Sequence, residues 1–101
     1  MPNDEPSRLE YLVEIMVNLP PDQPPERRAQ LLAAELRRGK ELKAAGSIER
    51  IWRVPGAIRN VGLWRATDAT ELHELIASLP LFPYMDVKVT SLARHPIESS
   101  S

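Results

Sequence analysis

The chain has 101 residues, with 13 lysines and arginines against 14 aspartates and glutamates, 43% hydrophobic residues and no cysteine. That length fits a single domain with one core, and the lack of cysteine excludes a disulfide framework, a thiolate nucleophile and a cysteine-ligated metal site. The formal net charge of -1 gives no basic footprint for nucleic acid, and no apolar run approaches the roughly 18 residues that a membrane span needs.

The two ends of the chain differ from its middle. Residues 1–9 and 97–101 carry proline, serine and acidic residues without apolar periodicity, so we expect flexible tails around a single domain at residues 10–96. The polar, acidic start is unlike a secretory signal peptide. A cytoplasmic location is therefore predicted.

The first half of the domain predicts a strand followed by a long helix. Residues 10–19 (EYLVEIMVNL) are rich in β-branched and apolar side chains with near-alternating polarity, and the run stops at Pro20-Pro21. A helix is expected over residues 27–45, because Pro25 suits a first helical turn, the segment is dense in Ala, Leu, Arg, Lys and Glu, and Gly46 follows.

A β-hairpin is predicted next. Residues 48–54 and 58–66 contain Ile, Val and Trp, and the breaker Pro55-Gly56-Ala57 separates them. Two runs of this kind joined by a short turn are typical of antiparallel neighbours.

A second helix and a last strand complete the domain. Thr67 or Asp68 can cap the helix, Glu71 has the capping-box spacing from Asp68, and Pro80 ends it. The apolar stripe of this helix is Leu72, Leu75, Ile76 and Leu79. Residues 84–92 then alternate between apolar and polar side chains, which predicts a strand.

The predicted order is β-α-β-β-α-β, the ferredoxin-like α+β sandwich with an antiparallel sheet and two helices on one face. Helices shield only one face of such a sheet. Apolar and aromatic side chains on the other face would be exposed in a monomer, so we expect a homo-oligomer.

Glu35 is the main candidate for chemistry. Helical periodicity places it inside an apolar arc that also contains Ala29, Leu31, Leu32, Ala33, Leu36 and Leu42. A buried carboxylate has a raised pKa, which suits a general base near neutral pH. The alternative is a boundary glutamate whose carboxylate reaches water or pairs with Arg28 or Arg38.

The predicted hairpin carries candidate binding residues. Arg53 and Arg59 flank its turn and, together with Arg50, can dock a carboxylate, although such residues are more often solvated surface arginines. Trp52 and Trp64 can wall a small apolar cleft, or they can fill the core or an interface.

Asn60, near the start of the third predicted strand, can donate its amide to a ligand carbonyl or enolate oxygen, or it can satisfy nearby backbone. Neither His73 nor His95 has a recognisable triad or metal partner in the sequence. We therefore expect no metal, and no nucleotide-binding or hydrolase motif is present.

Several of these segments resemble one known family. The stretch LPLFPYMDVKVTSL at residues 79–92, followed by Arg94-His95-Pro96, resembles the C-terminal signature of the muconolactone Δ-isomerase family. The resemblance continues through MVNLP at residues 16–20, the helix with Glu35, the IWRV strand and Gly56. It covers roughly residues 10 to 97.

The resemblance implies a ferredoxin-like subunit that assembles through homodimers into a larger ring-like homo-oligomer, such as a decamer. It also implies a cofactor-free isomerase of a lactone carboxylate in the cytoplasmic β-ketoadipate branch of aromatic catabolism. The implied reaction is a 1,3-proton shift, in which a base removes the C4 proton of muconolactone, a dienolate forms, and protonation at C2 gives the 3-oxoadipate enol-lactone.

The same resemblance implies roles for individual residues. Glu35 matches the helical glutamate of the family and is the expected proton shuttle. Arg53 is expected to hold the substrate carboxylate, and Asn60 to polarise the lactone. Trp52 and Arg59 complete the predicted substrate-binding set.

The chain departs from the family pattern in the hairpin. It has Ile48-Glu49-Arg50 where Trp-Arg-His is common, Ala57-Ile58 where a His-Tyr or Arg-Tyr pair is common, and Gly62 in place of the usual serine. We expect Gly62 to enlarge or dry its face of the sheet. The departures leave open a methyl- or chloro-substituted muconolactone, a dehalogenase that eliminates hydrogen chloride, or a non-catalytic lactone-binding protein on the same dimeric scaffold.

Overall fold

The computed structural model describes residues 8–98. Its strands are β1 (Leu9–Val17), β2 (Ile48–Val54), β3 (Arg59–Ala66) and β4 (Met85–Leu92), and its helices are α1 (Pro25–Ala44) and α2 (Ala69–Ala77). Short 3₁₀ turns lie at Phe82–Tyr84 and Pro96–Glu98. Each predicted helix and strand is therefore present, in the predicted order.

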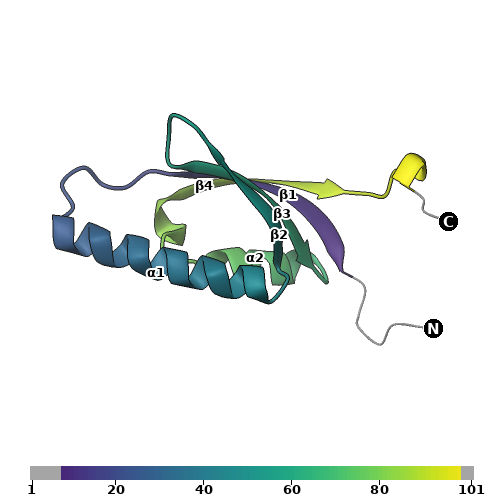
Figure 1. Ribbon diagram of the computed structural model, residues 1–101, viewed down its shortest axis with the longest axis horizontal. Coiled ribbons are helices and arrows are strands. Elements are labelled where there is room, and N and C mark those ends of the chain that lie inside the picture. The colour runs from purple at the N-terminus through teal and green to yellow at the C-terminus, as the bar shows by residue number, and fades with distance from the viewer. Residues whose placement is uncertain (1–7, 99–101) are drawn as a thin grey trace.

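The four strands form one sheet with the order β2-β3-β1-β4, and each neighbouring pair is antiparallel. Figure 1 shows both helices on the same side of this sheet. This arrangement confirms the ferredoxin-like α+β fold. None of the helices within residues 8–98 is long and apolar enough to cross a membrane.

The ends of the ordered domain differ slightly from the prediction. Strand β1 begins at Leu9, inside the segment predicted as a tail, and it ends at Val17 rather than at residue 19. At the other end, Ile97 belongs to the second 3₁₀ turn. The remaining parts of the two predicted tails, residues 1–7 and 99–101, lie outside the described residues.

The alternation along β1 decides which side of the sheet is buried. Tyr11, Val13, Ile15 and Val17 are buried, and the residues between them are only half-buried. We call the side with these four residues the helix face and the other side the open face. Since directly paired residues of antiparallel strands share a face, the β1 register assigns Trp64, Gly62 and Asn60 to the helix face.

The core lies between the helix face and the two helices. Its buried members are Tyr11, Val13, Ile15, Val17, Leu31, Leu42, Ile48, Trp64, Ala66, Leu72, Ile76, Leu79 and Leu81. All of these residues form a single cluster. The expectation of one core is confirmed for the described part of the chain.

Helix α1 buries a narrower stripe than the predicted apolar arc. Leu31 and Leu42 are buried, and the half-buried Glu35 and Arg38 lie between them at helical spacing. Leu36, which belonged to the predicted arc, is 61% exposed. The prediction was wrong there because an arc of six apolar residues is wider than the contact line between one helix and the sheet.

The second helix begins as predicted. The Asp68 side chain accepts a hydrogen bond of 2.8 Å from the backbone N–H of Glu71, and Oε1 of Glu71 accepts one of 2.7 Å from the backbone N–H of Thr67. These bonds satisfy N–H groups that have no partner within the helix. Asp68, and not Thr67, is therefore the N-cap residue.

Candidate functional site

Glu35 lies on the buried stripe of α1, where its Oε1 accepts a hydrogen bond of 2.9 Å from the backbone N–H of Leu81. The expected alternative of a pair with Arg38 is not what the structure shows. Arg38 instead donates to Oε1 of Glu41 at 2.9 Å and to Oγ of Ser78 at 3.0 Å. Within residues 8–98, Glu35 forms no ion pair.

The environment of Glu35 shifts its protonation. Burial raises the pKa of this carboxyl above its usual value, and the hydrogen bond from Leu81 opposes that shift without cancelling it. No cation of residues 8–98 pairs with the carboxylate. Glu35 therefore holds a proton more readily than an exposed glutamate does, in line with one of the two alternatives that the sequence left open.

Arg53 and Asn60 lie directly opposite each other on β2 and β3. Asn60 also pairs with the buried Ile15 of β1, so the side chains of both residues belong to the helix face, the side covered by α1. Arg53 is exposed and Asn60 is half-buried. Oδ1 of Asn60 is buried without a hydrogen-bond partner among the described residues.

Trp52 and Arg59 lie on the open face, away from Glu35. Trp52 pairs with Val61, is 47% exposed and carries the Arg50 guanidinium 5.0 Å from its ring centroid. Arg59 reaches Glu14 across the same face. The predicted basic group at the hairpin is therefore divided, with Arg53 on one face and Arg50 and Arg59 on the other.

The two tryptophans do not wall a common cleft. Trp64 pairs with Tyr11 of β1, lies on the helix face and is 0% exposed, whereas Trp52 lies on the open face. Of the two alternatives for this pair, the shared cleft is therefore not formed, and Trp64 fills the core. The reason is that the β-bulge between Ile48 and Arg50 adds one residue to β2 and so changes which residues of the two strands share a face.

Trp64 also carries a polar atom that the sequence analysis did not single out. Its Nε1 is buried and has no hydrogen-bond partner within the described chain. The sequence does contain one indication of this group. Successive members of the series Asn60, Gly62 and Trp64 are two residues apart in one strand, so they must share a face. Pattern alone could not show that the indole N–H lacks a partner.

Gly62 does not enlarge the helix face, contrary to expectation. A Cβ at this position would lie 2.9 Å from Nε1 of Trp64 and 3.2 Å from its Cδ1. The space that a serine would use is occupied by the edge of the indole. The glycine is therefore matched to the large side chain two residues later.

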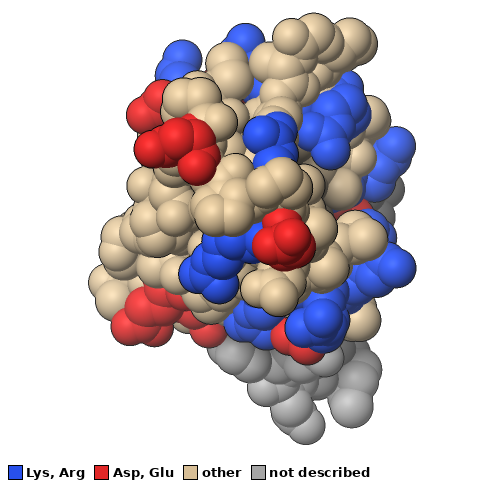
Figure 2. Space-filling view, turned by 90° about the vertical axis from the view of Figure 1, so that its left-hand side faces the viewer, with Lys and Arg blue, Asp and Glu red and all other residues tan. Residues whose placement is uncertain are grey.

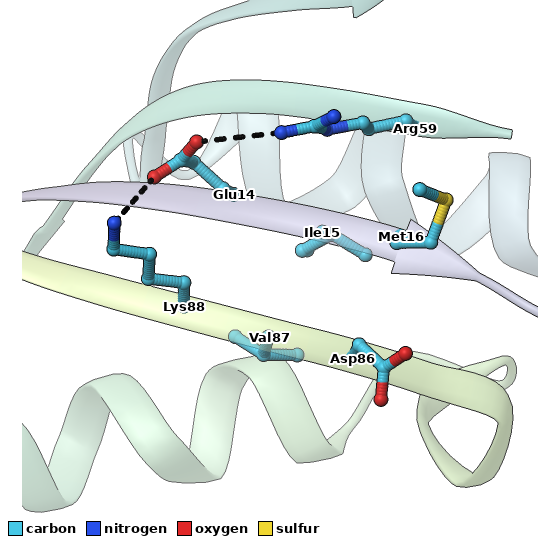
Figure 3. A pocket seen from close by; sticks show the side chains of 7 residues that line it. All are labelled: Glu14, Ile15, Met16, Arg59, Asp86, Val87 and Lys88. Carbon is cyan, nitrogen blue, oxygen red and sulfur yellow. Dashed lines mark ion pairs between the residues drawn. The ribbon is translucent and has the colours of Figure 1, made fainter. Parts of the chain in front are cut away.

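A cavity of about 350 Å³ opens beside Arg59 and Glu14, close to the β1–β4 pairing (Figure 3). Glu14 lies between two cations, with Oε1 at 3.8 Å from Arg59 and Oε2 at 3.9 Å from Lys88. Because Glu14 already compensates both cations, this cavity is a weak site for an anion.

A second cavity, of about 440 Å³, lies between α2 and β4, and its lining includes Leu72, Ile76, Phe82, Val87 and Val89. It is mainly apolar. Glu35, Arg53 and Asn60 line neither of these two cavities.

The end of the molecule with the β2–β3 turn and the start of α1 is shown in Figure 2. Basic side chains spread across this surface and occupy more of it than the acidic ones do. An anionic ligand that approaches this end therefore meets a locally favourable charge although the chain as a whole is nearly neutral.

The histidines take no part in a catalytic arrangement. His73 packs edge-to-face on Phe82, with ring centroids 6.0 Å apart, and Nδ1 of His95 accepts a hydrogen bond of 3.0 Å from the backbone N–H of Ile97. Among residues 8–98, no three His, Asp or Glu side chains are placed to hold a metal ion.

Comparisons with known proteins agree on one family. A family model described as "Muconolactone delta-isomerase" matches residues 9–98. The chain is 40% identical to Muconolactone Delta-isomerase 2 of Acinetobacter lwoffii, over 84% of this chain and 88% of that protein. It is also 40% identical to the Muconolactone Delta-isomerase of Cupriavidus pinatubonensis, over 85% of this chain and 94% of the relative.

The fold leads to the same family. A crystal structure of muconolactone isomerase at 3.3 Å resolution superposes with a TM-score of 0.85 at 34% sequence identity, and the match covers 92% of this chain and 97% of the other. Sequence and fold therefore agree over nearly the whole ordered domain. The chain belongs to the muconolactone delta-isomerase family.

Proposed function

We propose that this protein catalyses the 1,3-proton shift that converts muconolactone, or a substituted muconolactone, to the corresponding 3-oxoadipate enol-lactone. The observation that carries the proposal is Glu35, a half-buried carboxylate with a raised pKa and no cation partner in the described chain. Membership of the family supports the same reaction. The substrate is thus a small lactone carboxylate in aromatic catabolism.

Glu35 is the proposed proton shuttle. The C4 proton of muconolactone is acidified by the conjugated lactone, and its removal gives a dienolate with negative charge on the former carbonyl oxygen. One carboxylate oxygen of Glu35 is held by Leu81, so the other is free to take the proton and return it at C2. A raised pKa favours this role because the base must also act as an acid in the same cycle.

Arg53 and Asn60 are the proposed binding groups. A guanidinium holds a carboxylate through charge-assisted hydrogen bonds, and the amide of Asn60 can donate to the lactone oxygen on which charge develops. Both side chains belong to the face that carries α1. Trp52 and Arg59 lie on the open face and are not part of this proposed site within one subunit.

The hairpin departures make a substituted lactone part of the proposal. Ala57 supplies no polar group, and Ile58 packs against the core. The hydroxyl and imidazole donors common in the family are therefore missing here. The apolar side chains at these positions suit a methyl or chloro substituent. If chlorine is on the carbon next to C4, removal of the C4 proton forms a double bond between these two carbons and expels chloride, so hydrogen chloride is lost overall.

We also propose that the protein acts in the cytoplasm as a homo-oligomer that associates through the open face. Open-face positions alternate between apolar residues and charges of both signs, and these are Glu10, Leu12, Glu14, Met16, Glu49, Trp52, Val61, Leu63, Arg65 and Lys88. Such a surface is complementary to itself under a twofold axis. A second copy of the chain is its expected occupant.

The direct test is turnover of (+)-muconolactone by the purified protein, followed by ultraviolet absorbance and by proton NMR in D₂O. We expect loss of the C4 proton and formation of the enol-lactone. Parallel assays of methyl- and chloro-substituted muconolactones identify the preferred substrate. Binding of these lactones by calorimetry without turnover of any of them would overturn the proposal in favour of a non-catalytic binding protein.

A further inference from the structure

The indole N–H of Trp64 is the least explained polar group of the helix face. The residue is 0% exposed, and its Nε1 has no hydrogen-bond partner among residues 8–98. A buried donor without an acceptor is destabilising, and buried tryptophan N–H groups usually have a partner. A phenylalanine would fill a similar core position without that cost.

The position of Gly62 shows where the N–H lies. Nε1 and Cδ1 are the indole atoms closest to a Cβ built at Gly62, at 2.9 and 3.2 Å. The nitrogen-bearing edge of the ring therefore leans along β3 over the bare backbone of Gly62. Gly62 lies between Trp64 and Asn60 on this face, so the N–H lies on the Asn60 side of the ring.

Asn60 presents a second unpartnered polar atom on the same row. Its Oδ1 is buried and has no hydrogen-bond partner in the described chain. Residues two apart in a strand are separated by roughly 6.6 Å, so the backbones of Asn60 and Trp64 lie about 13 Å apart. The indole edge covers Gly62 within this span, so a ligand would lie between that edge and the Asn60 side chain.

The pairing of β2 with β3 places a cation beside Asn60, Gly62 and Trp64. Arg53 is directly opposite Asn60 on β2, and Ile51 is directly opposite Gly62. Both β2 residues are exposed, so the row can be reached from the β2 edge of the sheet. A ligand with a carboxylate near Arg53 would place its ring beside Asn60, next to the indole edge that covers Gly62.

We propose that the Nε1–H of Trp64 donates a hydrogen bond to the carbonyl oxygen of the bound lactone and thereby stabilises the dienolate oxyanion. This inference rests on the proposed function. It assigns to Trp64 a direct contact with the reacting group, and to Gly62 the role of leaving room for the indole edge. The lactone supplies the acceptor that the indole N–H does not find among residues 8–98.

The test separates the N–H from the ring that carries it. Trp64→Phe removes the donor, and replacement of Trp64 by β-(3-benzothienyl)alanine substitutes sulfur for the N–H at nearly constant volume. We expect either change to lower kcat for lactone isomerisation by roughly 10²-fold, the effect of losing one oxyanion donor. Tyr11→Phe is the matched control, because it deletes one hydroxyl from the neighbouring position of the helix face, and it should leave kcat and KM unchanged.

A second readout follows the N–H itself. In protein labelled with ¹⁵N-tryptophan, the indole peak lost in Trp64→Phe identifies Trp64. The saturated analogue of muconolactone, which cannot isomerise, should shift that peak downfield because its carbonyl accepts the hydrogen bond. A purely structural role for Trp64 would leave the peak in place.

Retention of kcat within twofold in the benzothienyl protein would overturn the inference, and so would a loss of rate without an indole shift. Both outcomes leave the proposed function intact if Glu35→Gln is inactive. Absence of turnover by the wild-type protein would instead contradict the proposed function, while the indole shift would still decide whether Trp64 binds the lactone.

Discussion

Glu35 and Leu81 are joined by a hydrogen bond of 2.9 Å, in which the backbone N–H of Leu81 donates to Oε1 of the carboxylate. The bond links the middle of α1 to the segment between α2 and β4, and Leu81 itself is buried. The hydrogen bond thereby holds the carboxylate in one orientation in a partly buried environment. The most direct predictions concern this residue.

Glu35→Gln should lower kcat for muconolactone isomerisation by at least about 10²-fold, the usual contribution of a positioned general base. The amide oxygen of glutamine can still accept the hydrogen bond from Leu81, so the fold should persist. Ultraviolet and NMR assays with circular dichroism check both points. Glu74→Gln, an exposed change on α2, is the control, and equal rates for wild type and Glu35→Gln would show that Glu35 is not the base.

The pH dependence of activity should report the raised pKa of Glu35. A general base must be ionised, so kcat/KM should fall as pH decreases through a pKa above the ordinary value for glutamate of about 4.3. The pH–rate profile between pH 4 and 8 measures this. An acidic limb at or below the ordinary value would contradict the assignment.

The same shift predicts a change in stability. Because the pKa of Glu35 is higher in the folded than in the unfolded state, the folded state binds the proton more tightly. Its favourable contribution is fully present below the unfolded pKa and is lost as pH rises through the folded pKa. Urea unfolding should therefore show a smaller decline in stability with rising pH for Glu35→Gln than for wild type, and parallel curves would count against a raised pKa.

The division of the arginines between two faces gives a paired experiment. Arg53→Gln should raise KM for the lactone roughly tenfold or more, because a charge-assisted contact with the carboxylate contributes about 1.5–3 kcal/mol. Arg59→Gln, on the open face beside Glu14, should leave KM within about twofold, since its loss is that of a surface pair. Steady-state kinetics of the two variants measure both KM values. Equal increases in KM for Arg53→Gln and Arg59→Gln would show that Arg53 does not hold the substrate carboxylate.

Self-association should depend on the open face. Trp52→Glu introduces a charge at an apolar position of that face and should shift sedimentation from a homo-oligomer towards a monomer, because an unpaired charge is costly to bury at an interface. Leu36→Glu changes a more exposed apolar site on α1 and should leave the assembly intact. Dissociation by Leu36→Glu alone would move the interface to the helices.

The N-cap of α2 should contribute a local part of the stability. Asp68→Ala removes the acceptor for the Glu71 N–H and should cost about 1 kcal/mol of unfolding free energy. Asp68→Asn, which keeps a side-chain oxygen, should cost less. Urea unfolding at pH 7 and a fixed protein concentration measures both, and an equal loss for the two variants would show that charge, and not the hydrogen bond, matters at this position.

The sequence by itself determined the order and the type of the secondary-structure elements. Alternating apolar residues, the prolines at residues 20, 55 and 80 and the capping signal at Asp68 are local features, and local features decide where strands and helices begin and end. The same periodicity placed Glu35 on the covered side of α1. Its partial burial, which raises the pKa of the carboxyl, is a finding of the structure.

Only the tertiary structure decided which side chains share a face and which polar atoms lack partners. A single β-bulge in β2 placed Trp52 on the side of the sheet opposite Trp64, and it was not visible in the pattern of apolar residues. The unpartnered N–H of Trp64 arises from its approach to Gly62 within the packed core. Such properties depend on the register between strands that are distant in the chain, and a one-residue change of register moves every following side chain to the other face.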